Sequence, residues 1–414
     1  MTLLALAGLL LAAQTQPDFK VDPDLIRIAR IRVHMSENLT RLPNYTCTQT
    51  IERSRRHARS RRFELQDTLR LEVALVEGKE LFSWPGSGKF EDKELRELIG
   101  GGGTFGNGDF AIHARSVFLS SVPTYQYEGE LEEKGRRVFR YSYNVPQMLS
   151  GYRVRVAEHD AIVGYHGHFL VDTGTLDLVA LEVITDDIPP HLMLDSTSSL
   201  MNYARIPIGG STFLLPQSSV LTVRDLQGGE SRNHIQFSAC RQYATESFLS
   251  FADPTPEAAP AAAPPPPRML EVPEGLTLDL RLQTPISLES SAIGDEVTAM
   301  LGSNAKHRGQ IILPKGAIVR GRLMRMTKFF NRTEIFNISL QFTRFEYPGA
   351  FGDLYATLED AGPSIMPNAR ATVLVPSADY PGQGTISLRG NRLELGKGFR
   401  MLWRTQSKSS GNRQ

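Results

Sequence analysis

The stretch "YHGHFLVDTGTLDLVALEVI", residues 165 to 184, alternates apolar and polar side chains on both sides of a short polar segment. Alternation with a period of two predicts a pair of half-buried β-strands. Asp172, Thr173 and Gly174 supply the residues of the turn between the two strands. The stretch therefore reads as a β-hairpin, and it predicts an antiparallel sheet.

Similar patterns extend this sheet in both directions along the chain. Single strands are predicted within residues 45–53, 67–76, 81–84 and 233–243, and further hairpins within 125–145 and 203–225. The turns of these hairpins are expected at Glu133–Gly135 and at Gly209–Gly210. Together the segments predict one long antiparallel sheet.

Helices are predicted before the first strand and between later strands. Residues 24–42 place apolar side chains at helical spacing, with Pro23 in the first turn and Pro43 at the end. The apolar positions are Leu25, Ile28, Ile31, Met35, Leu39 and Leu42. Shorter helices are expected at 92–99 and 109–121, separated by a glycine-rich bend or lid at 100–108. The predicted fold class of residues 17–252 is α+β, an antiparallel half-barrel sheet with covering helices.

A Pro/Ala-rich segment, "DPTPEAAPAAAPPPPR" at 253–268, predicts an extended linker. At ~3.1 Å per residue it could span about 50 Å. Residues 269–405 then alternate short strand patterns with glycine and proline turns, which predicts an all-β small barrel or sandwich. The tail at 406–414 is expected to be disordered.

The N-terminal residues point to export. Residues 1–13 form an apolar run of signal-peptide length that ends in small residues, and the alternative is a buried N-terminal helix. In an oxidising compartment Cys47 and Cys240 are expected to form a disulfide, worth up to roughly 5 kcal/mol in the chain-entropy model. Two buried free thiols are the alternative. No other segment is long and apolar enough for a transmembrane helix.

An arginine-rich run, "RSRRHARSRR", occupies residues 53–62. The net charge of the whole chain is only +1, and the run lacks interleaved aromatic residues, so nucleic acid is excluded as the expected partner. An exposed hairpin connection is the leading interpretation. The alternative is a patch for anionic lipid headgroups made by Arg53, Arg55, Arg56, Arg59, Arg61 and Arg62.

Candidate chemistry is sparse. His166 and His168 share one strand face, and with His159 or Asp160 they would make a conceivable metal site, although surface histidines are the commoner explanation. Asp186 and Asp187 are expected in a loop beside two prolines. The "GSGK" at 86–89 does not match a phosphate-binding loop, and no GxSxG nucleophile motif is present. No metal, cofactor or catalytic residue is therefore predicted, and a hydrolase or metal enzyme ranks third among the functions.

The C-terminal part resembles the periplasmic β-barrel of the VirB10/TrbI family of bacterial secretion scaffolds. The likeness rests on "LTLDLRLQTPIS" (276–287), "GDEVTAML" (294–301) and "IILPKGAIVRGRL" (311–323). That family carries a membrane-crossing helical insertion, and no such apolar helix is seen here. The resemblance therefore implies a small periplasmic barrel that docks onto other envelope proteins, without a pore.

The N-terminal part resembles exported envelope proteins of Acidobacteria-type bacteria and, more loosely, the LolA/LolB lipoprotein carriers. The likeness rests on "LPNYTCTQTIER" (42–53), "GTFGNGDFAIHARSVF" (103–118), "FLVDTGTLDLVALE" (169–182) and "IPIGGSTFLLP" (206–216). Carriers of this kind hold an apolar ligand between a half-barrel and its helices. A fully packed core in that place is the alternative.

These features predict a non-enzymatic binding or carrier protein for an apolar ligand or lipoprotein. The protein is expected to be exported, and periplasmic or associated with the outer membrane. Lipid or lipoprotein and envelope proteins are the expected partners, with peripheral membrane contact through the arginine run. The alternative function is a structural scaffold of an envelope or secretion-like complex.

Overall fold

The computed structural model describes residues 22–77, 79–87, 90, 95–99, 109–243, 267–329, 335–362, 370–374, 382–390 and 393–407. Three predictions therefore lie outside the described residues: the signal peptide at 1–13, the glycine-rich bend at 100–108, and the linker at 253–268 up to residue 266. The same holds for the tail beyond residue 407.

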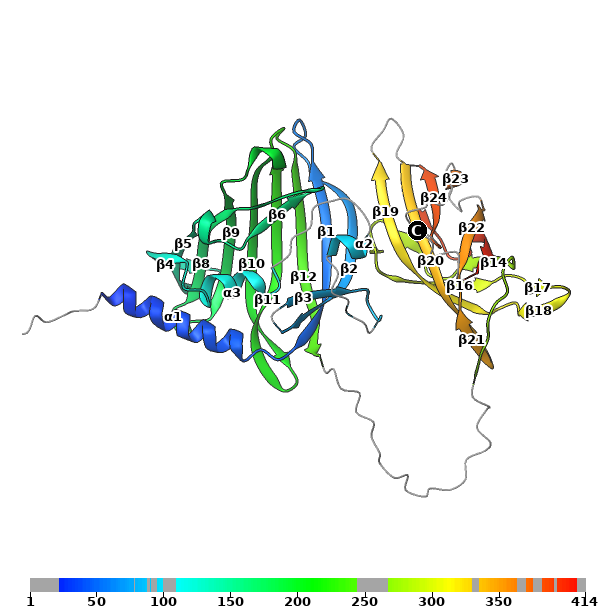
Figure 1. Cartoon of the computed structure of the whole chain (residues 1–414), viewed down its shortest axis with the longest axis horizontal. Helices are drawn as coiled ribbons and strands as arrows, with labels where there is room; N and C mark the ends of the chain where they lie inside the picture. The colour runs from blue at the N-terminus through cyan, green and yellow to red at the C-terminus, as the bar shows by residue number, and fades with distance from the viewer. Residues whose placement is uncertain are drawn as a thin grey trace, which may run out of the picture.

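Ten strands form one antiparallel sheet that curls into a half-barrel (Figure 1). In spatial order they are β3 (Lys79–Ser83), β2 (Glu64–Val76), β1 (Tyr45–Arg56), β12 (Glu230–Gln242), β11 (Ser211–Asp225), β10 (Leu194–Ile208), β9 (Leu178–Asp186), β8 (Gly164–Asp172), β5 (Arg136–Val145) and β4 (Thr124–Glu133). The first strand in sequence of this sheet, β1, pairs with the last, β12. This pairing brings residues nearly 200 positions apart side by side, as the Cys47–Cys240 separation of 193 shows.

The predicted hairpins are confirmed, and their turns have the expected chemistry. Lys134 and Gly135 both adopt positive φ, and so do Gly209 and Gly210, as tight two-residue hairpin turns require. In the β8–β9 turn the Asp172 carboxylate accepts hydrogen bonds from the backbone N–H groups of residues 174 and 175, each at 2.9 Å. Local sequence therefore sets the register of each strand pair.

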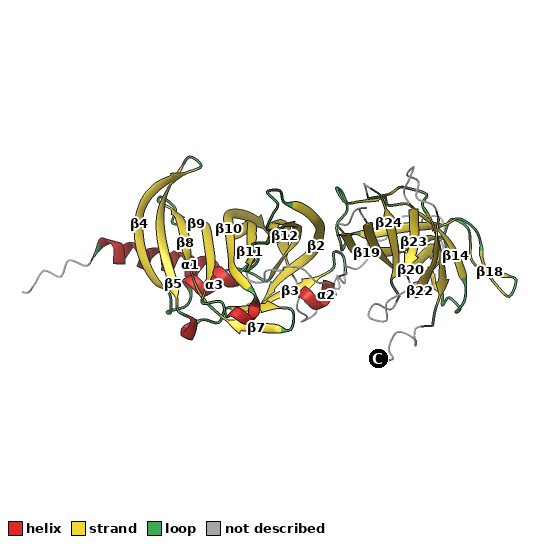
Figure 2. Cartoon of the chain, turned by 90° about the horizontal axis from the view of Figure 1, so that it is seen from above, coloured by secondary structure: helices red, strands yellow, loops and turns green. Residues whose placement is uncertain are grey.

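Helix α1 (Pro23–Thr40) confirms the longest predicted helix, and it packs together with α3 (Ile112–Phe118) against one face of the sheet (Figure 2). Ile31, Met35 and Leu39 of α1 are buried. We expected Leu25 on the same face, and this prediction is wrong. Leu25 is 61% exposed, so the first turn of α1 does not cover the sheet. A third helix, α2 (Leu95–Ile99), is short. None of the helices in the described ranges combines the length and apolarity needed to cross a membrane.

The half-barrel region contains local elements that were not predicted, and one residue whose predicted position is wrong. A small hairpin of β6 (Arg153–Val156) and β7 (His159–Ile162) pairs outside the main sheet. Single 3-10 turns follow β5 and β9, at Gln147–Leu149 and Pro190–Leu192. The expected loop position of Asp186 is wrong, because this residue ends β9 and pairs with Gly164.

The C-terminal strands form a second sheet, and short strands separated by turns are present as expected. Its main path is β13 (Arg268–Met269), β21 (Ala350–Asp353), β20 (Ile335–Tyr347), β19 (Ile318–Phe329), β16 (Glu296–Leu301), β14 (Thr277–Leu282), β26 (Arg400–Thr405) and β22 (Ala356–Ala361). From β20 a branch leads to β24 (Gly384–Arg389) and β23 (Arg370–Leu374). Short ladders join β15 (Ile286–Ser287) to β25 (Glu394–Leu395), and β17 (Ala305–His307) to β18 (Gln310–Leu313).

Trp403 anchors the core of the second sheet. It is fully buried, and its ring meets that of Phe342 edge-on at 5.1 Å between centroids. Within the described strands no hydrogen-bonded pairing joins β22 to β23, although the two strands lie next to each other. The molecule as a whole is mostly β with a curled half-barrel sheet. The sharper division into an α+β part and a separate small barrel stays a prediction.

Candidate binding site on the half-barrel

The sheet face beneath the helices is filled by aromatic side chains. The Phe169 ring of β8 stacks on Tyr141 of β5 at 5.3 Å, and it meets Phe118 of α3 edge-on at 5.1 Å. All three residues are at most 1% exposed. Buried aromatic rings in such contact leave little room for a ligand. This layer therefore corresponds to the packed-core alternative, and the acyl-chain cavity expected between helix and sheet is not found at these residues.

Polar contacts hold α1 on this layer. The Arg27 guanidinium lies 4.3 Å from the centroid of the Tyr127 ring, within cation–π range. Further along the helix, His34 Nε2 lies 2.9 Å from Asp177 Oδ1. The same carboxylate accepts two hydrogen bonds from Arg205, at 2.6 and 2.8 Å. Burial alone would raise the pKa of Asp177, but the bonds from Arg205 and His34 outweigh it and keep this pKa below its usual value.

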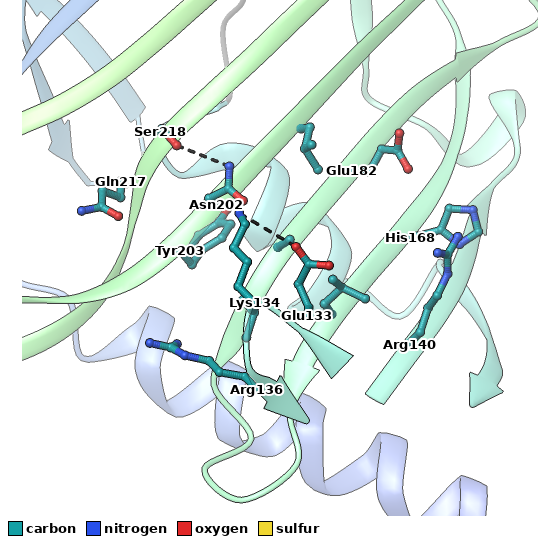
Figure 3. A pocket seen from close by; sticks show the side chains of 14 residues that line it. Glu133, Lys134, Arg136, Arg140, His168, Glu182, Asn202, Tyr203, Gln217 and Ser218 are labelled. Carbon is teal, nitrogen blue, oxygen red and sulfur yellow. Dashed lines mark hydrogen bonds and ion pairs between the residues drawn. The ribbon is translucent and has the colours of Figure 1, made fainter. Parts of the chain in front are cut away.

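The opposite face of the same strands carries an open pocket of about 630 Å³ (Figure 3). Because side chains alternate along a strand, the neighbours of buried Phe169 and Leu181 point into it. Its aliphatic floor is formed by Leu170, Val179, Ala180 and Leu200. Its polar and charged lining residues are Glu133, Lys134, Arg136, Arg140, His168, Glu182, Asn202, Tyr203, Gln217 and Ser218.

Two features of this pocket are typical of a binding surface. Leu200 is 42% exposed, so a large aliphatic side chain meets water in the middle of a sheet face. Lys134, at the tip of the β4–β5 hairpin, lines the pocket and lies 3.9 Å from the carboxylate of Glu133 (Figure 3). Convergent polar groups around an apolar floor are the usual arrangement of small-molecule sites.

On the β5 and β8 side of the pocket, Arg140 and His168 share a carboxylate partner, Glu128. Arg140 donates to Glu128 Oε2 at 2.6 Å, and His168 Nδ1 lies 3.2 Å from the same oxygen. Partial burial would raise the pKa of Glu128, but the hydrogen bond from Arg140 and the charge of His168 lower it below its usual value. At the rim, Lys134 and Arg136 have exposed side chains, and Lys134 Nζ forms a long ion pair of 3.9 Å with Glu133 Oε1. An exposed pair of this length is weak, so both cations are accessible to a ligand.

The conceivable metal site is not assembled. His166 and His168 do lie on one strand face, but His166 Nδ1 pairs with Asp186 at 2.8 Å, and His168 faces Glu128. Asp160 instead forms an ion pair with Arg153. Across the described part of the chain no group of three or more His, Cys, Asp or Glu side chains is placed to hold a metal ion.

One buried polar cluster escaped the sequence analysis. The Ser219 hydroxyl donates to Asp109 Oδ2 at 2.5 Å, and His113 Nε2 lies 3.6 Å from Asp109 Oδ1. All three residues are buried, and burial lowers the pKa of His113. The carboxylate stands between the other two groups, so the serine hydroxyl does not contact the imidazole. In an activated Ser–His pair the hydroxyl would contact the imidazole directly. The spacing of Asp109 and His113, four residues apart, was the only signal in the sequence.

The disulfide is present. It joins β1 to β12 where the pairing of these strands shifts register, between Thr46 and Thr48. Ala239, next to Cys240, takes up the irregularity with a positive φ. The bond therefore links the first and last strands of the half-barrel sheet.

The arginine run divides in two. Arg53 is 7% exposed and makes two hydrogen bonds of 2.6 Å to the Asp67 carboxylate, so it is not part of an exposed connection or of the alternative surface patch. Arg56 donates to buried Glu230 at 2.7 Å. The remaining arginines lie exposed in the connection from β1 to β2 or beside it, namely Arg55, Arg59, Arg61 and Arg62.

Comparison with known proteins yields no family. No family model matches the sequence, and no curated protein matches it. A domain assigned to outer membrane lipoprotein sorting, from Vibrio parahaemolyticus, aligns with 14% identity and a TM-score of 0.29 over 55% of this chain and 95% of its own. A DUF1329 family protein from Desulfovibrio piger aligns with 12% identity and a TM-score of 0.30 over 56% of this chain and 98% of its own. At these TM-scores neither likeness carries an argument about function.

Proposed function

We propose that this chain is a non-enzymatic binding or carrier protein of the bacterial cell envelope, which takes a lipid or the lipidated end of a lipoprotein. The observation that carries the proposal is the pocket opposite the helices, with its aliphatic floor around Leu200 and its charged rim. An amphiphile matches both parts, since its hydrocarbon would cover Leu200 and its polar head would reach Lys134 and Arg136. The rigid sheet would preorganise the site.

The location and organisation belong to the same proposal. A disulfide across the sheet is typical of an oxidising compartment, which supports export to the periplasm or the outer membrane surface. The proposed organisation is a signal peptide at 1–13, an α+β half-barrel domain at 17–252, a linker at 253–268, a small β-barrel domain at 269–405 and a tail at 406–414.

The first test replaces the floor of the pocket. Leu200→Lys places a charge on the aliphatic floor and is expected to weaken binding of a fluorescent fatty acid at least tenfold. Leu226→Lys is the matched control, because Leu226 is 53% exposed and lies outside the lining of the pocket. Equal affinity in the two variants would reject this pocket as the lipid site.

A second test identifies the natural ligand. Native mass spectrometry of protein purified from its own envelope is expected to show a bound lipid that denaturation releases. A ligand-free mass, together with unaltered probe binding in Leu200→Lys, would favour the second candidate, a scaffold of an envelope or secretion-like complex. The VirB10-like sequence of the C-terminal part supports that candidate, and the C-terminal sheet would then contact the envelope partners.

The exposed arginines support a weaker, peripheral membrane contact. Replacing Arg55, Arg59, Arg61 and Arg62 with Gln is expected to reduce binding to vesicles that contain phosphatidylglycerol, in a salt-dependent manner. Neutral phosphatidylcholine vesicles are the control. Unchanged binding to the anionic vesicles would discard this contact.

A further inference from the structure

A loop of the C-terminal part lies along an open edge of the first sheet. Strand β3 pairs only with residues 72–76 of β2, so the preceding part of β2 is an edge. There the Ile293 N–H donates to the Thr68 carbonyl at 2.7 Å, and the Arg70 N–H donates to the Ile293 carbonyl at 2.8 Å. The loop thus forms an isolated parallel β-bridge with β2, between Ile293 and Leu69. In Figure 1 the two sheets meet at this point, between β2 and β19.

Side chains complete the contact. Arg70 forms an ion pair with Asp295, and the second oxygen of Asp295 accepts the N–H of Ala292 at 2.8 Å. From β19, Arg322 donates to the carbonyl of Gly294, and it donates to the carbonyl of Pro85 at 2.9 Å. Main-chain pairing gives the loop its place, and these charged contacts give it specificity.

Gly294 is the residue that this approach requires. Its φ is +103°, and a Cβ atom there would lie 2.2 Å from the Arg70 carbonyl oxygen and 2.9 Å from the Trp84 ring. Such distances cannot be relieved without moving the β2 backbone, so any other residue would push the loop away. The close approach is therefore built into the sequence Ile293-Gly294-Asp295.

We propose that the β2 edge from Thr68 to Arg70, with Trp84 beside it, is a docking site for an extended segment of a partner protein that carries an aliphatic residue, a glycine and an acidic residue in succession. The chain's own Ile293–Asp295 segment occupies the site as an internal competitor. Exposed strand edges bind extended backbone readily, and proteins commonly cover them. Residues 244–266 lie between the two sheets in the sequence, so the C-terminal part stays covalently attached when the loop leaves the edge.

The first experiment opens the site in the full chain. In Gly294→Ala, hydrogen exchange of the Arg70 amide is expected to accelerate at least tenfold, and the radius of gyration in solution scattering to increase. Gly309→Ala is the matched control, because Gly309 also has a positive φ, +82°, but no atom lies within 4 Å of its Cβ position. Wild-type exchange in Gly294→Ala would overturn the proposed role of the glycine.

The second experiment fills the site again. A labelled peptide with the sequence of residues 289–297, "ESSAIGDEV", is expected to bind Gly294→Ala at least tenfold more tightly than wild type and to restore protection of the Arg70 amide. The same peptide with valine in place of glycine is expected not to bind. If Gly294→Ala opens the contact but binds neither peptide, the edge is an internal contact and not a docking site.

A charge-reversal pair keeps the proposal testable if Gly294→Ala does not fold. Arg70→Glu opposes Asp295 with like charge and is expected to open the contact, with the same change in exchange and scattering. Adding Asp295→Arg to this variant is expected to restore the docked state. Failure of the double variant to recover would mean that the ion pair does not hold the loop.

Discussion

The two faces of strand β8 differ in what their side chains do. Phe169 packs between Tyr141 and Phe118 and is completely shielded from water. Its neighbours His168 and Leu170 point the other way, into an open pocket with charged walls. A single curled sheet thus separates a face that packs against the helices from a face that carries an open pocket. Substitutions on the two faces should therefore change different measured properties.

The largest expected effect concerns the disulfide Cys47–Cys240, whose Cys47 is fully buried. Replacing both cysteines with alanine is expected to lower the free energy of unfolding by up to about 5 kcal/mol, because a long loop is released in the unfolded chain. Denaturant unfolding with and without reductant measures it. Reductant should leave the double variant unaffected, and a stability equal to that of the wild type would contradict the expectation.

The next effect compares adjacent residues of β8 directly. Phe169→Ala is expected to cost about 3–5 kcal/mol, since it leaves a cavity in the aromatic layer. His168→Ala, on the pocket face, is expected to cost less than about 1 kcal/mol, because it removes only a partly exposed ion pair. Equal losses in urea unfolding would show that the pocket face also carries the fold.

The same contrast separates two arginines of one run. Arg53→Gln is expected to destabilise the protein by about 3 kcal/mol, because it leaves the Asp67 carboxylate buried without its partner. Arg55→Gln, at an exposed position, is expected to change stability by at most about 0.5 kcal/mol. Thermal unfolding of the pair measures the difference, and matching midpoints would place Arg53 at the surface.

The smallest effect depends on pH. Burial opposes ionisation of Glu230, but its hydrogen bonds from Arg56 and Arg232 lower its pKa below the usual value of 4.5. A lowered folded-state pKa stabilises the protein above the unfolded-state pKa, and this contribution disappears as pH falls through the folded value. Glu230→Gln is therefore expected to cost roughly 1–3 kcal/mol at pH 7 and progressively less from pH 5 down to pH 3. A difference that is constant with pH would contradict the assignment.

Much of the local structure follows from the sequence. The alternation around Asp172–Gly174 predicts β8 and β9, and the apolar spacing from Ile28 to Leu39 predicts α1. These signals are local, because the repeat of apolar residues in a strand or helix is visible over a few neighbouring positions of the sequence. The disulfide was also predicted, since only two cysteines are present and an exported chain favours their pairing.

The tertiary structure decided the rest. The burial of Arg53 depends on Asp67 lying opposite it on β2, and the docking of Ile293 depends on an edge more than 200 residues earlier in the chain. The pocket exists because β4, β5, β8, β9, β10 and β11 curl together, so that the hairpin tip at Lys134 and Asn202 of β10 line the same pocket. Sequence periodicity determines which side chains share a face. Strand order and curvature, which arise from pairings between distant segments, determine what each face meets.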